Sequence, residues 1–146
     1  MTTKPKGLAK IWREIKRPFR QCCGAGTEVD PRFYASCDIG NLGELLKQGT
    51  LFPHPVGIVI ATHAKLGKRC KIWQNVTIGA KSDEGARAGE YPKIGNDVLI
   101  YAGAVIFGSI EIGDKCVIGA NSVVTKSFEA NSIIAGIPAR KIGENQ

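Results

Sequence analysis

Hydrophobic residues recur at every sixth position through most of the chain. From Ile94 the sequence divides into the hexads IGNDVL, IYAGAV, IFGSIE, IGDKCV and IGANSV, each led by isoleucine. The same register holds before residue 80, where IATHAK, LGKRCK, IWQNVT and IGAK follow one another. The second position of a hexad is often glycine, and the fifth is small or aliphatic. Nine hexads in one register indicate an internal structural repeat.

A six-residue period fits short β-strands joined by regular corners, because six is a multiple of the strand period of two and not of the helical 3.6. Each hexad can turn its leader and its fifth residue inward, while glycine supplies corner angles that cost other residues energy. Three such faces close a triangular coil of about 18 residues, and coils stacked about 4.8 Å apart form a solenoid. The sequence therefore predicts an all-β solenoid. A β-sandwich is the alternative, but its turns would follow at about 8–12 residues without fixed register.

The hexads are interrupted between Ile78 and Ile94, which are 16 positions apart. Residues 80–93 are mostly polar, and we expect them to leave the solenoid as an extruded loop. Loops on rigid scaffolds often carry binding groups. The alternative is a tolerated insertion without a function of its own.

A helical pattern precedes the repeat. Within residues 5–19, apolar residues recur at spacings of three and four, with basic residues around them and Pro18 near the end; the apolar set is Leu8, Ile11, Trp12, Ile15 and Phe19. This pattern predicts a short amphipathic helix in a basic N-terminal arm, residues 1–36, ahead of a repeat domain, residues 37–146. We expect its apolar face to pack on the solenoid or on a neighbouring subunit. The alternative is peripheral contact with an anionic membrane surface.

The net charge of +7 comes almost wholly from the first 20 residues of this arm. Residues 1–20 carry seven basic residues and one acid, which leaves +1 for the remaining 126 residues. This distribution argues against a nucleic-acid partner for the repeat domain. No apolar run approaches the about 20 residues of a transmembrane helix, and no apolar signal-peptide block follows the first charges. We therefore expect a cytoplasmic protein.

The five cysteines follow no metal-ligand spacing, so we expect reduced thiols and no metal site. Cys22 and Cys23 are adjacent in the arm, and Cys37 follows at its end. Cys70 and Cys116 occupy the inward fifth position of their hexads, which predicts core residues without chemistry.

Hexads of the form Ile-Gly-x-x-small-x resemble those of the hexapeptide-repeat acyltransferases, whose fold is a left-handed parallel β-helix. Three stretches are similar to the serine O-acetyltransferase branch and its polysaccharide-modifying relatives: His54-Pro-Val-Gly-Ile-Val-Ile60, Ile72-Trp-Gln-Asn-Val-Thr-Ile-Gly79 and Ala135-Gly-Ile-Pro-Ala-Arg140. The resemblance covers about residues 38–143. It implies an acetyl-CoA-dependent O-acetyltransferase that assembles as a homotrimer, with active sites between subunits.

Two departures from the serine branch bear on the acceptor. Pro53 stands where those enzymes place an acid before the catalytic histidine, and Glu90-Tyr91 replaces their Arg-His pair. Serine is a zwitterion, and its recognition calls for groups of opposite charge. We also expect no counterpart of the long N-terminal helical domain of those enzymes. We therefore expect a sugar hydroxyl of a surface polysaccharide or its precursor as acceptor, with Tyr91 as a contact; serine is the alternative.

Acetyl transfer to a hydroxyl needs a base that takes the alcohol proton and returns one to the CoA thiolate, a role suited to histidine. His54 matches the family's catalytic position, whereas His63 falls at an exposed corner. Without catalysis, His54 would be a buried cap on the first coil. Asp38 is the candidate carboxylate to orient the base, although its spacing to His54 is one residue longer than the family's; a loop-capping role is the alternative.

The resemblance also implies where CoA would lie. Small residues would let the pantetheine arm approach the backbone, and cations would bind the phosphates; by position these are Gly79, Ala80, Ala102 and Ala120, and Lys126, Arg140 and Lys141. Tight coils and ordinary surface charge are the alternatives for each. A non-catalytic scaffold protein on the same repeat is the alternative of another class. A metal-dependent hydratase would need three histidines, and the chain has two.

Overall fold

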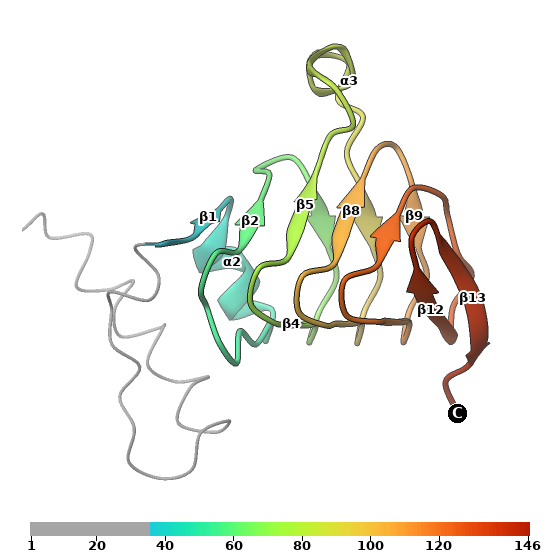
Figure 1. The fold of residues 1–146 in the computed structure, drawn as a ribbon. Coiled ribbons are helices and arrows are strands. Elements are labelled where there is room, and N and C mark those ends of the chain that lie inside the picture. The colour runs from blue at the N-terminus through green and yellow to red at the C-terminus, as the bar shows by residue number, and fades with distance from the viewer. Residues whose placement is uncertain (1–35) are drawn as a thin grey trace, which may run out of the picture.

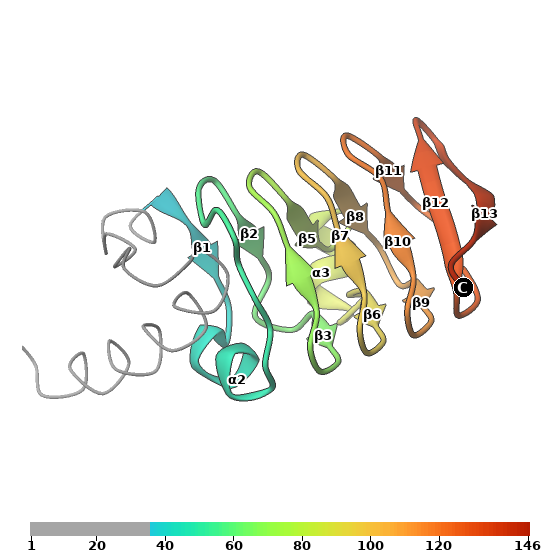
Figure 2. The same ribbon diagram turned by 90° about the horizontal axis from the view of Figure 1, so that it is seen from below.

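The structure, a computed structural model, describes residues 36–146. The basic arm with its predicted helix, Cys22 and Cys23 lie outside the described residues. Within 36–146 the chain winds into a coil whose turns stack along one axis (Figures 1 and 2). Successive turns add strands to three sheets.

Strands of two to six residues make up these sheets. Sheet A contains β1 (Asp38–Ile39), β2 (Val59–Ile60), β5 (Thr77–Gly79), β8 (Val105–Phe107) and β11 (Val123–Val124). Sheet B contains β4 (Lys71–Ile72), β7 (Leu99–Ile100), β10 (Val117–Ile118), β12 (Ser132–Gly136) and β13 (Ala139–Glu144). Sheet C contains β3 (Lys65–Leu66), β6 (Lys93–Ile94) and β9 (Glu111–Ile112). All pairs are parallel except β12 with β13.

The register of the sheets confirms the predicted turn of three hexads. Val59 pairs with Thr77 in sheet A, and Leu99 pairs with Val117 in sheet B, each 18 positions apart. Because 18 is a multiple of two, the same side chains point inward in every turn.

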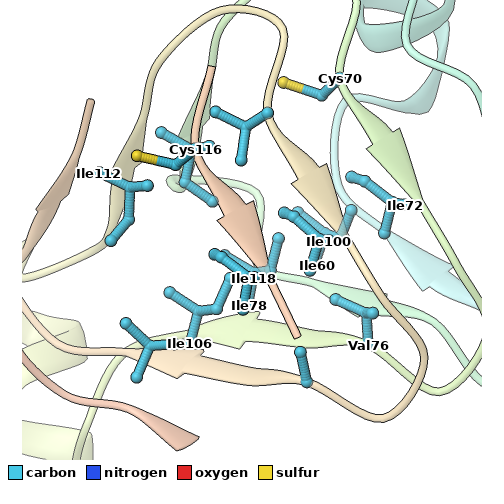
Figure 3. Close-up of a cluster of buried hydrophobic side chains, with 14 of the residues drawn as sticks. Ile60, Cys70, Ile72, Val76, Ile78, Ile100, Ile106, Ile112, Cys116 and Ile118 are labelled. Carbon is cyan, nitrogen blue, oxygen red and sulfur yellow. The ribbon is translucent and has the colours of Figure 1, made fainter. Parts of the chain in front are cut away.

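Hexad leaders fill the core of the coil. Ile72, Ile78, Ile100, Ile106 and Ile118 are fully buried, and the inward fifth positions lie among them (Figure 3). Burying an isoleucine side chain contributes about 1.5–3 kcal/mol relative to leaving it exposed, so the stacked leaders are the main source of stability.

Different elements close the two ends of the coil. At the N-terminal end, the short helix α2 (Leu42–Lys47) buries Leu45 and Leu46 in the same apolar cluster as Phe52 (Figure 1). The hexad pattern does not predict this helix. At the C-terminal end, β13 folds back against β12 as an antiparallel pair.

The segment between β5 and β6 leaves the coil. Lys65 pairs with Lys93, 28 positions later, so this turn is ten residues longer than the regular ones. The extra chain carries the helix α3 (Asp83–Arg87), which stands away from the sheets in Figure 1. Ser82 precedes α3, and its Oγ accepts a hydrogen bond from Gly85 N at 3.1 Å. A serine followed by two acids is a typical helix start, although the sequence analysis expected only a loop.

Candidate active site

His54 lies on a bulge of the first described turn. Leu51 pairs with Lys71, 20 positions later, whereas Val59 pairs with Thr77, 18 positions later. The intervening segment therefore has two more residues than the same segment of the next turn. The two extra residues lie before Val56. The Val56 carbonyl accepts a hydrogen bond from Asn75 N at 2.9 Å, and the later corners between sheets B and A have the equivalent hydrogen bond.

The bulge turns His54 outward. The backbone N–H of Val56 donates to the His54 carbonyl at 2.8 Å, which closes a three-residue γ-turn around Pro55. Pro55 behind it is buried, while His54 itself is exposed. The alternative of a buried cap on the first coil is therefore wrong, and the imidazole is accessible to a ligand.

The corner between sheets B and A, which we call the B–A corner, carries a column of residues in line with this bulge. Trp73 and Tyr101 are the first residues after β4 and β7, and their rings stack with centroids 4.6 Å apart and planes 18° apart. Gly119 takes the same position after β10. Neither aromatic residue follows from the hexad pattern or from the motifs around His54. Trp73 and Tyr101 are 28 positions apart in the sequence, which is the length of the long turn. This spacing is the sequence signal from which their contact could have been predicted.

Small residues follow this column on the same corner. Ala102 and Ala120, two of the expected CoA contacts, lie at equivalent positions of consecutive turns, because Asn121 N donates to the Ala102 carbonyl at 2.9 Å. Gln74 takes that position one turn earlier, and its Oε1 is buried without a hydrogen-bond partner in the described part of the chain. The B–A corner thus combines an exposed imidazole, an aromatic stack, small residues and an amide oxygen that can accept a hydrogen bond.

Asp38, the candidate carboxylate, forms no hydrogen bond with His54 in the described part of the chain. It lies in β1, is exposed, and pairs in register with Val59 on the outer face of sheet A. Its neighbour Cys37 donates from Sγ to the Pro55 carbonyl at 3.1 Å, so the two segments are close. Among residues 36–146, however, no hydrogen bond or ion pair joins the Asp38 carboxylate to the imidazole.

The remaining expected contacts lie on the corner between sheets A and C, which we call the A–C corner. Gly79 ends β5 there, Ala80 begins the extruded segment, and Tyr91 lies near the end of that segment. The Tyr91 ring stacks on His63, with centroids 5.2 Å apart and planes 29° apart. One chain therefore separates His54, Ala102 and Ala120 from Gly79, Ala80 and Tyr91.

The three expected phosphate-binding cations lie near the C-terminal end of the coil. Lys126 follows β11, with its Nζ 5.5 Å from the centroid of the Phe128 ring. Arg140 and Lys141 lie on β13, and Lys141 forms an ion pair with Glu144 at 3.0 Å. Arg140 is exposed, and its Nη1 donates to the Ala139 carbonyl.

The core cysteines take no part in this chemistry. Cys70 and Cys116 are fully buried and unpaired by disulfides, which confirms their predicted place in the core (Figure 3). Burial raises the pKa of the Cys70 thiol to about 11, so it stays protonated and unreactive at neutral pH. Within residues 36–146 there is no group of three side chains placed to hold a metal ion. Nor do the helices of this region include one long and apolar enough to cross a membrane.

Comparison with known proteins agrees with the repeat and the fold. The family described as "Bacterial transferase hexapeptide (six repeats)" matches residues 91–126. The serine acetyltransferase of Synechococcus elongatus is 37% identical over 100 residues, which are 68% of this chain and 40% of that protein. That of Mycobacterium tuberculosis is 34% identical over 71% of this chain and 44% of its own length.

Solved structures agree too. The crystal structure of the Brucella abortus serine acetyltransferase is 36% identical, with a TM-score of 0.62 over 76% of this chain and 41% of that one. Its complex with coenzyme A is 34% identical, with a TM-score of 0.63 over 76% and 41%. The chain thus spans about two fifths of the length of these relatives. The predicted left-handed parallel β-helix is confirmed, and by repeat, fold and sequence identity the chain belongs to the hexapeptide-repeat acyltransferases.

Proposed function

We propose that this protein is an acetyl-CoA-dependent O-acetyltransferase in which His54 is the general base. The observation that carries the proposal is the two-residue bulge, which exposes the imidazole at the one described place where the regular B–A corner is lengthened. The relatives are serine acetyltransferases, and one of their structures holds coenzyme A. An exposed histidine at the family's catalytic position argues against the non-catalytic scaffold.

The chemistry follows from a single proton carrier. His54 takes the proton of the acceptor hydroxyl while the oxygen attacks the thioester carbonyl carbon. The tetrahedral intermediate then collapses with cleavage of the C–S bond, and the imidazolium returns the proton to the CoA thiolate. We propose Asp38 as the carboxylate that comes to support the imidazolium in the substrate complex, since its neighbour Cys37 bonds to Pro55 beside His54 and a base works best when its tautomer is held.

Two acceptors are candidates. The relatives are named serine acetyltransferases, which makes serine, the alternative of the sequence analysis, the first acceptor to test. The sugar hydroxyl rests on residues alone: Pro53 supplies no charge beside His54, and Tyr91 offers a stacked ring. A site without opposite charges leaves the carboxylate of serine unpaired, which costs free energy, whereas an aromatic ring packs against the apolar face of a sugar.

We also propose that the chain works as a homotrimer. The outward residues of sheet C are charged, as Lys65, Lys93 and Glu111 show, whereas those of sheet A include Val59, Val105 and Val123. Val59 is 42% exposed in the single chain. Covering such a face with a second copy removes apolar surface from water. It would also let the A–C corner of one subunit approach the B–A corner of the next. Tyr91 of one subunit and His54 of its neighbour would then lie in one site.

A thiol-release assay tests the proposed activity. The full chain is incubated with acetyl-CoA and either serine or a panel of sugars, and free CoA thiol is followed. Serine-dependent release supports the first acceptor, and sugar-dependent release supports the second. Release with neither acceptor above the hydrolysis background would count against the proposed function. Light scattering of the same sample checks the trimer, since a monomer that acetylates its acceptor contradicts a site shared between subunits.

A further inference from the structure

His63 and Tyr91 form a contact that the proposed chemistry does not use. Lys65 and Lys93 are paired in sheet C, and His63 and Tyr91 each lie two residues before their strand. The two rings therefore occupy the same position in successive turns, on either side of the extruded segment. Their stacking is a side-chain contact between the end of the segment and the coil.

The rest of the segment is bonded mainly to itself. The hydrogen bonds that the structure describes for residues 81–91 join residues of that segment, including Glu90 N to the Gly85 carbonyl at 2.8 Å and Tyr91 N to the Gly89 carbonyl at 3.1 Å. The ladder to the preceding turn begins only at Pro92, whose carbonyl accepts from Lys65 N at 3.0 Å. A self-contained segment joined to a scaffold at its root can change its angle when a root contact is lost.

We propose that His63 is a positioning residue that holds Tyr91, and with it the segment 80–92, in the orientation that receives the acceptor. The acceptor part rests on the proposed function. The imidazole supplies a flat ring for Tyr91 to stack on, and a half-buried tyrosine that loses that ring gains rotamer freedom. His63 is on the A–C corner and His54 is on the B–A corner, so the two histidines of the chain have separate roles.

Limited proteolysis tests the contact without any assay of activity. Lys81 and Arg87 are exposed trypsin sites inside the segment. We expect His63→Ala to be cut at these sites about 2- to 10-fold faster than wild type, which is the range for losing one aromatic contact, and His63→Phe to restore wild-type cutting. Thr62→Ala, on the same corner, is the matched control, and cleavage after Lys126 is the internal reference. Wild-type cutting of His63→Ala at both sites would overturn the proposal.

Kinetics test whether the contact serves the acceptor. We expect His63→Ala to raise KM for the acceptor several-fold while kcat and KM for acetyl-CoA stay close to wild type, with His63→Phe again restoring the acceptor KM. Faster proteolysis with unchanged acceptor KM would overturn the acceptor role. If wild type acetylates no acceptor, that role is overturned together with the proposed function, whereas the proteolysis result still decides whether His63 holds the segment.

Discussion

The regular turns of the coil place their leading residues in the packed core, whereas its two interruptions place residues outside the repeat. In the regular turns every sixth residue is a buried leader, such as Ile100 or Ile118, and neighbouring turns repeat one another at 18 positions. At the bulge before Val56 and in the segment 80–92, the chain has residues that the repeat does not need. His54 and Tyr91 lie in those extra residues.

The difference separates stability from chemistry. Each leader packs against the turns before and after it, so a change there removes contacts from three layers. A residue in an insertion bears little of this packing, and its side chain is free to face a ligand. Substitutions in the two regions should therefore have opposite effects on activity and on folding.

The largest expected effect comes from the bulge. His54→Ala should lower kcat/KM for acetyl transfer by about 10²- to 10⁴-fold, the usual contribution of a general base. The melting temperature should change little, because the side chain is exposed. Thiol release and thermal unfolding measured on the same preparation check both halves. Activity close to wild type would contradict the role of His54.

A leader of a regular turn should show the reverse behaviour. Ile100→Ala removes a fully buried side chain and should lower the free energy of unfolding by about 2–5 kcal/mol. Its neighbour Leu99, which points outward and is half-buried, is the matched control, and Leu99→Ala should cost clearly less. Denaturant unfolding of both variants measures the difference. Equal losses would contradict the inward and outward assignment.

A smaller effect is expected at a regular corner. Gly103 has φ +71°, and an added Cβ would overlap the side-chain amide of Asn121 in the next turn. Gly103→Ala should therefore lower the free energy of unfolding by at least about 1–2 kcal/mol, the cost of the left-handed backbone alone. Gly43→Ala is the control, because Gly43 lies in α2 with open space around it and should be neutral or slightly stabilising. Chemical denaturation compares the two.

The smallest effect is expected at an exposed ion pair between consecutive turns of the coil, on either side of the lengthened turn. Arg69 donates to both oxygens of Asp97, at 2.7 and 2.6 Å, and this hydrogen bonding holds the pKa of Asp97 below its usual range. A lowered carboxyl pKa in the folded state stabilises the fold above the unfolded pKa, and the gain is lost as pH falls through the folded value. Asp97→Asn should therefore show a slightly shallower fall in melting temperature between about pH 5 and 3. An identical pH profile would show that the pair contributes nothing measurable.

Much of this arrangement was predictable from the hexads. The leaders, the small fifth positions and the departure at Ile78 follow from local period alone, because the same backbone repeats and the same side chain must point inward each time. The helix α2 was not predictable in this way, since it replaces a turn at the end of the coil and has no repeat to follow. Its buried residues, Leu45 and Leu46, are apolar in a pattern too short to identify a helix.

The site was predictable only in part. Motif position singled out His54 and Tyr91. The exposure of His54, however, follows from the strand register, which shows that its segment has two more residues than the same segment of the next turn. The stacks of Trp73 on Tyr101 and of His63 on Tyr91 each join residues 28 apart. That separation belongs to the lengthened turn, so neither pair follows from the regular period of 18.

The sequence by itself determined the repeat, the inward faces and the break between Ile78 and Ile94, because a hydrophobic period is a local property of the chain. Only the tertiary structure decided which residues meet across turns. Alignment of one turn with the next depends on the number of residues that each insertion adds, and on the hydrogen bonds that bring the chain back into register. The separation of His54 from Tyr91 on two corners is a result of that winding.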